Sequence, residues 1–206
     1  MGPTKALKEY LRGNLTLSIV ILIIFSAGII GGSLGISTLS NQQQSELLNY
    51  VDLVLQGSGD WQVDSGGLAQ KVIWSNIKLV LLMWFLGMTV VGIPLILLIV
   101  FLRGVVLGFT VGFLIQEKAL AGVLLTLLSI IPQNIIFVPV LLLSAVGAVS
   151  FSLNLIRGKF SRSLHLSQYF IGYSVGYMLA LLIVSLGGLV EAYISPAFIR
   201  LIAVYF

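Results

Sequence analysis

Glu117 and Lys118 are the charged residues whose position most suggests chemistry, because they interrupt the apolar stretch from Gly104 to Ile131. A carboxylate near or inside the hydrocarbon of a bilayer is costly and usually has a function, such as binding a proton or an ion. On a helix, Lys118 points about 100° away from Glu117, so the two charges do not pair automatically. The alternative is a polar hinge at the membrane interface with both side chains reaching water, and we favour it.

The rest of the sequence offers little that could carry catalysis. It has no cysteine and one histidine, His165, which lies beside a basic segment as a solvated loop residue would. No serine lies in a GxSxG motif, and neither HExxH, a P-loop nor a GxGxxG fingerprint occurs. We therefore expect no catalytic residue, no cofactor, no metal site and no enzymatic activity.

Gly104, Gly108 and Gly112 form a GxxxGxxxG ladder. Glycines at this spacing share one helical face and let a second helix approach closely. The pattern leaves open whether that helix belongs to the same chain or to another protomer, so a homo-oligomer is one alternative. The same spacing recurs in three glycine pairs: Gly28 with Gly32, Gly31 with Gly35, and Gly172 with Gly176.

The composition is that of a membrane protein. Hydrophobic residues make up 58% of the 206 residues and charged residues 9%, with a mean hydropathy of +1.11, whereas soluble domains carry about 25% charged residues. The net charge of +4 does not indicate a nucleic-acid partner, because the basic residues form small clusters between apolar runs. We expect an all-α membrane protein, a polytopic helical bundle of about five transmembrane helices with short interfacial helices.

Uncharged runs of about 20 residues predict where these helices lie. Gly92 and Pro94 are expected to kink the second of them. The predicted transmembrane helices cover 15–36, 76–102, 104–131, 134–156 and 166–190, and the third is broken. The other parts of this single membrane domain, residues 1–206, are a cytoplasmic interfacial segment at 1–14, an extracytoplasmic loop at 37–73, a cytoplasmic loop at 157–165 and an extracytoplasmic tail at 191–206.

Two shorter helices are expected outside the membrane core. Apolar residues recur at helical spacing over Gln42–Gln56, which predicts an amphipathic helix in the extracytoplasmic loop. Ser195 and Pro196 could start a last short helix in the tail.

The orientation follows from the basic residues, which concentrate on the cytoplasmic side of membrane proteins. Arg103 would end the second span and Arg157 the fourth, so both are expected in the cytoplasm. Two crossings must then separate them, and 134–156 supplies only one. The stretch 104–131 is therefore predicted to cross as a broken helix, or to start with an interfacial segment around Gly104–Gln116, rather than to turn back as a hairpin. The N-terminus is expected inside and the C-terminus outside.

Pro132, Gln133 and Asn134 link the third and fourth predicted spans. They read as an ordinary tight turn at the outer face, or as part of a substrate site at a discontinuous helix, as transporters have. Pro139, within the fourth span, frees a carbonyl that Asn134 or Gln133 could bond.

Three stretches of the chain resemble a known family. They are RGVVLGFTVGFL at Arg103–Leu114, PQNIIFVP at Pro132–Pro139 and the NLIR exit of the fourth span. Together with the basic N-terminus and the acidic outer loop, they make nearly the whole chain similar to the stage II sporulation protein M family.

The resemblance implies a non-enzymatic component of the engulfment machinery of endospore-forming bacteria. It would lie in the septal and mother-cell membrane and localise two partner proteins, of the sporulation D and P type, that degrade peptidoglycan. The motif positions carried over as packing or interaction residues are Arg103, Gly104, Leu107, Gly108, Phe109, Gly112, Pro132, Gln133 and Asn134.

The main alternative is a small transporter or channel subunit that uses the interrupted third helix and Glu117. On either interpretation, membrane lipids are also expected as partners. An intramembrane enzyme is a third alternative, but the sequence has no acid and base paired at a readable spacing.

Overall fold

A computed structural model describes residues 12–57, 65–157 and 163–203, and every secondary-structure element within these ranges is helical. The expected all-α polytopic class is confirmed. Within the described ranges, four helical stretches are long and apolar enough to cross a membrane, over Leu15–Thr38, Gly92–Leu120, Asn134–Ile156 and Ser167–Leu189, and a shorter apolar helix covers Ile73–Gly87.

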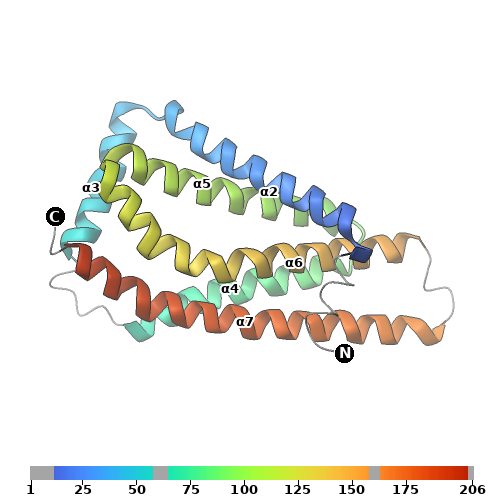
Figure 1. The fold of residues 1–206 in the computed structure, drawn as a ribbon. Helices are drawn as coiled ribbons and strands as arrows, with labels where there is room; N and C mark the ends of the chain where they lie inside the picture. Colours follow the sequence, from blue (N-terminus) through green and yellow to red (C-terminus); the bar gives the residue numbers. More distant parts are fainter. Residues whose placement is uncertain (1–11, 58–64, 158–162, 204–206) are drawn as a thin grey trace.

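The long helices run back and forth along one another, and α3 lies across one end of them (Figure 1). We call this the α3 end and the opposite one, where Arg157 follows α6, the basic end. The elements in chain order are α2 (Leu15–Gly35), the short η1 (Ile36–Thr38), α3 (Asn41–Gly57), α4 (Ser65–Gly87), α5 (Gly92–Leu125), the π-helix η2 (Thr126–Ile130), α6 (Ile131–Ile156) and α7 (Ser163–Ala203).

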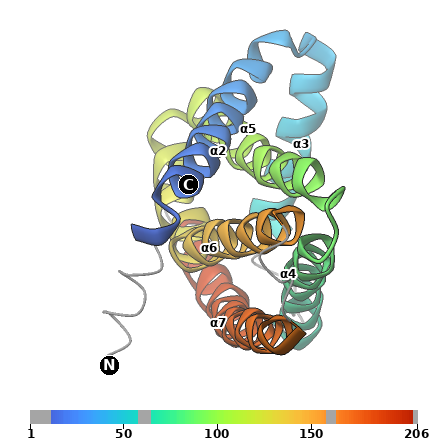
Figure 2. The same cartoon turned by 90° about the vertical axis from the view of Figure 1, so that its right-hand side faces the viewer.

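Helix α6 is the centre of the bundle. Viewed from the basic end, α2, α5, α4 and α7 surround it (Figure 2). Half of its apolar window is buried, against 17–28% for the other three candidate spans. One face carries Leu141, Ala145, Ala148 and Ser152, all with no exposed surface. The small side chains of the last three let neighbouring helices approach closely.

The second predicted span, 76–102, is wrong as a single helix. Helix α4 ends at Gly87, and a turn at Met88–Val91 separates it from α5. A Cβ at Gly92 would overlap the Leu86 carbonyl, so this position needs glycine for the tight return. Pro94 lies in the first turn of α5, where a missing N–H costs nothing, and starts a helix instead of kinking one.

The buried Ser152 of α6 helps to hold this turn. Its hydroxyl lies 2.6 Å from the Gly87 carbonyl oxygen and 3.1 Å from that of Thr89. Carbonyls at a helix end lack an intrahelical partner, so a hydroxyl from the central helix supplies one.

Because α5 begins at Gly92, earlier than predicted, Arg103 does not lie at a helix end. Arg103 is eleven residues beyond Gly92, about 17 Å along the helix at 1.5 Å per residue. It therefore lies within the candidate span Gly92–Leu120, and the use of Arg103 to mark a cytoplasmic loop was wrong. The direction predicted for the third span still agrees with α5, which runs from the basic end to the α3 end (Figure 1).

The interruption predicted in the third span lies at Ala119. This residue has φ 47° and ψ −121°, while the helix continues on both sides. A Cβ at Gly122 would overlap the Leu114 carbonyl, so the chain bends sharply enough here to require glycine. The π-helix η2 then leads directly into α6.

Two further expectations concern the ends of the bundle. The amphipathic helix expected at Gln42–Gln56 is present as α3, whereas the separate helix expected from Ser195 is absent because α7 continues to Ala203. Most of the predicted interfacial segment (residues 1–11) and of the predicted cytoplasmic loop (158–162) lies outside the described residues.

Candidate functional site

The glycine ladder of α5 packs against α2 of the same chain. A Cβ at Gly104 would overlap the Phe25 carbonyl oxygen, and one at Gly108 would overlap that of Ile29. A Cβ at Gly112 would come within 2.6 Å of the Ile36 side chain. The two backbones therefore touch along about two turns of each helix.

The contact is reciprocal. Gly28 and Gly32 of α2 face the carbonyls of Phe101 and Val105 on α5, and a Cβ at either glycine would overlap them. Such backbone contact gives van der Waals packing that larger side chains would prevent. The α2–α5 pair is the most extensive helix contact of the bundle.

The other glycine pairs behave differently. A Cβ at Gly31, Gly35, Gly172 or Gly176 would meet nothing within 4 Å. Spacing alone could not separate these positions from the packed ones, because it shows that glycines share a face but not where that face points.

Leu107 and Phe109 belong to the same family motif, and both contribute to packing. Leu107 is half-buried against the core cluster. Phe109 stacks on the buried Phe113, with 6.1 Å between ring centroids and 6° between their planes.

Arg103 lies at mid-helix beside polar and aromatic partners from two other helices. Its Nη2 is 3.4 Å from the Oδ1 of Asn76 on α4. Its guanidinium carbon lies 4.8 Å from the ring centroid of Phe137 on α6. A cation inside an apolar bundle needs such contacts, because neither lipid nor aliphatic side chains replace its hydration.

Sequence reasoning missed Asn76, which is 5% exposed. A usable signal existed, because Asn76 and Arg103 each lie eleven residues from the turn, counted from Gly87 and Gly92. Residues at equal distances from a turn between antiparallel helices lie at the same depth. Placing the turn correctly would therefore have paired them.

At the break in α5, Lys118 pairs with α3 and not with its neighbour Glu117. Its ammonium is 2.5 Å from Asp52 Oδ1, and the two side chains are 27% and 40% exposed. Glu117 is half-buried next to it. The ion pair ties the helix across the bundle end to the point where α5 bends.

Pro132, Gln133 and Asn134 do not form the predicted tight turn. They lie in the first turn of α6, directly after η2. The Asn134 Nδ2 donates to the Ile130 carbonyl at 2.8 Å, not to the carbonyl freed by Pro139. Nearby, the Thr126 hydroxyl is buried without a hydrogen-bond partner within the described part of the chain.

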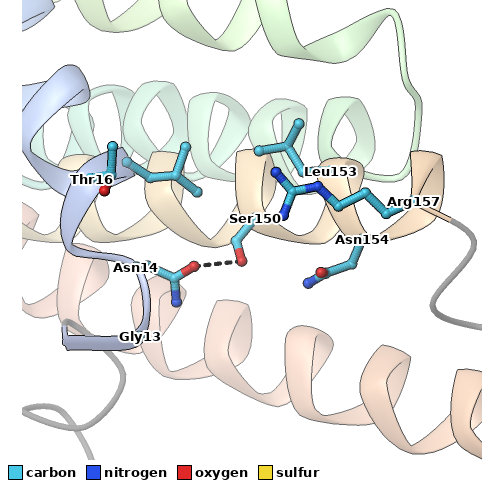
Figure 3. A pocket seen from close by; sticks show the side chains of 8 residues that line it. Gly13, Asn14, Thr16, Ser150, Leu153, Asn154 and Arg157 are labelled. Atoms are coloured by element: carbon cyan, nitrogen blue, oxygen red, sulfur yellow. Dashed lines mark hydrogen bonds between the residues drawn. The ribbon is translucent and has the colours of Figure 1, made fainter.

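A polar cavity of ≈ 540 Å³ lies at the basic end, between the start of α2 and the end of α6. Figure 3 shows the Ser150 hydroxyl donating to the Asn14 Oδ1, at 2.8 Å. Asn154 and Arg157 lie along the same side of α6 and complete the polar lining. Sequence reasoning missed this cavity because its residues come from segments about 140 positions apart.

Within the described ranges, no group of three His, Cys, Asp or Glu residues comes together that could hold a metal ion.

The arrangement is that of a polytopic helical membrane protein whose polar groups pair between helices. The chain belongs to the stage II sporulation protein M family, whose model, described as Stage II sporulation protein M, matches residues 20–196. No curated protein and no solved structure was found to match it.

The glycine contact predicts a position-specific loss of stability. Gly108→Leu should lower the thermal midpoint in detergent, because overpacking costs about 1–3 kcal/mol and the Ile29 backbone cannot move aside. Gly31→Leu, at an open position of α2, is the matched control and should melt like the wild type. Equal midpoints for both variants would contradict the assignment.

The ion pair predicts a local effect on α3. Lys118→Gln should raise amide hydrogen exchange over Asn41–Gly57 by up to about fivefold, the range expected for a partly exposed pair, and leave α2 unchanged. The charge-swapped double variant, Lys118→Asp with Asp52→Lys, should restore protection. Unchanged exchange in Lys118→Gln would show that the pair does not hold α3.

Proposed function

We propose that the chain is a non-enzymatic scaffold in the membrane of a spore-forming bacterium. In this role it holds peptidoglycan-degrading proteins, of the sporulation D and P type, at the septal and mother-cell membrane during engulfment. Membership of the sporulation family supports the setting. The observation that carries the scaffold role is a pair of exposed apolar side chains on α3.

The proposed orientation places the basic end in the cytoplasm and the α3 end outside, with α2, α4, α5, α6 and α7 all crossing. Six basic residues precede α2 or follow α6 in the chain (Lys5, Lys8, Arg12, Arg157, Lys159 and Arg162), whereas three belong to the parts of α4, α5 and α7 at the α3 end (Lys71, Lys118 and Arg200). This distribution follows the positive-inside rule. Helix α3 would then face the compartment that holds the cell wall.

Helix α3 has one face toward the bundle and one toward solvent. Leu47, Leu48 and Val51 are half-buried, while Tyr50 and Leu53 are 68% and 67% exposed. These two side chains lie three residues apart and so on one face of the helix. Outside the hydrocarbon, an exposed aromatic beside an exposed leucine favours a protein-binding surface.

Scaffolding needs this surface to be presented in a fixed direction. The Asp52–Lys118 ion pair fastens α3 to α5, and the glycine contact fastens α5 to α2. Since α3 follows α2 closely in the chain, it is held at both its start and its middle. A partner bound to Tyr50 and Leu53 would therefore be held at a defined position relative to the membrane.

A transporter role is less well supported. The break in α5 lies at the α3 end, where the Lys118 charge is paired with Asp52. Two cavities lie among the described residues of the start of α2, α6 and α7, and the residues that line them do not include Glu117.

The scaffold proposal predicts loss of a complex without loss of the fold. The double change Tyr50→Ser and Leu53→Ser should reduce co-purification of the D- and P-type proteins from sporulating cells at least tenfold, since central interface anchors contribute about 2 kcal/mol or more each. Val91→Ser, at an exposed apolar residue of the basic end, should have no effect. Full co-purification with the double variant would remove the main support for the proposal.

A further inference from the structure

A second, larger cavity extends along one side of α6 and α7. Its volume is ≈ 930 Å³, and its walls are mainly apolar and aromatic, including Val140, Leu143, Phe151, Tyr173 and Ile183. Figure 2 shows α4 on one side of the α6–α7 pair. The cavity also includes Asn14, which places it on the other side, toward the start of α2.

Two glycines of α7 shape this second cavity, which we call the groove. Gly172 and Gly176 line it, and a Cβ at either would meet nothing within 4 Å. These are the positions at which the expected close helix packing does not occur within the chain. The space in front of them is part of the groove.

The groove is continuous with the polar cavity at the basic end. Asn14, Ser150 and Asn154 line both of them. Arg157 lies at the polar mouth, and none of the described residues that line the two cavities is acidic. The combined site is therefore polar and positive at one end and apolar along the rest (Figure 3).

The dimensions suit an extended acyl chain. From Asn154 to Val140 the groove follows α6 for about 21 Å, compared with about 15 Å for the hydrocarbon of one leaflet. Its volume is ≈ 930 Å³, so the groove is long enough and wide enough for a lipid chain.

We propose that this groove binds an anionic phospholipid. Its phosphate lies at the polar mouth beside Asn154 and Arg157, and an acyl chain lies between α6 and α7. The positive charge of Arg157 complements the headgroup, and the apolar walls accommodate the acyl chain. The bound lipid fills the space that Gly172 and Gly176 leave open.

Native mass spectrometry of the purified full chain tests this site, with dioleoyl phosphatidylglycerol and dioleoyl phosphatidylcholine added as probes in detergent. The wild type should retain one phosphatidylglycerol in preference to phosphatidylcholine. Arg157→Gln should reduce phosphatidylglycerol retention about fivefold, the effect of one basic residue near a headgroup. It should leave phosphatidylcholine retention unchanged.

Filling the groove gives an independent variant. Gly176→Leu should abolish retention of both lipids, and Gly172→Leu provides a second variant in case the first one misfolds. Gly31→Leu, equally open but outside the groove, should retain lipid like the wild type. Wild-type retention in both groove variants would overturn the proposal, as would equal retention of the two lipids by the wild type. A change of oligomeric mass in Gly176→Leu with lipid retention intact would also overturn it and assign the groove to a second copy.

Discussion

The structure depends on the direct contact between the backbones of α2 and α5. In a membrane, apolar side chains gain nothing by leaving lipid for protein, so helices associate mainly through close van der Waals packing. Gly28 and Gly32 on one helix and Gly104 and Gly108 on the other allow that packing. The contact fixes the direction of α5, and with it the depth of Arg103 and the position of the break at Ala119.

The second constraint is that polar groups in the apolar bundle need partners. Ser152 donates a hydrogen bond to the turn between α4 and α5, and Asn76 accepts one from Arg103. Asn134 donates to the last carbonyl of η2. At the α3 end, Lys118 is paired with Asp52. Each of these contacts joins an irregular or charged position to a neighbouring segment, so the breaks in the helices are supported by the bundle around them.

The sequence analysis predicted the fold class, three of the four long apolar helices and the break near Lys118, because these depend on hydropathy and local charge. It misplaced the turn at Met88–Val91, because this stretch is as apolar as the spans on either side and no charge marks it. That error put Arg103 at a membrane surface and hid Asn76. The glycine spacing predicted close packing, but the face that packs and the pairing of Lys118 depend on residues far apart in the chain.

The account rests on α4 and α5 each crossing the membrane, with α3 outside and the turn at Met88–Val91 inside. Because the chain has no cysteine, single cysteines at Gln43 and Thr89, both exposed, can be labelled with an impermeant maleimide in intact cells. The account predicts labelling at Gln43→Cys in intact cells, and labelling at Thr89→Cys only after the membrane is permeabilised. Labelling of both cysteines from outside would show that α4 and α5 do not each cross, and labelling of Thr89→Cys alone would show the opposite orientation, so either result would contradict the proposed arrangement.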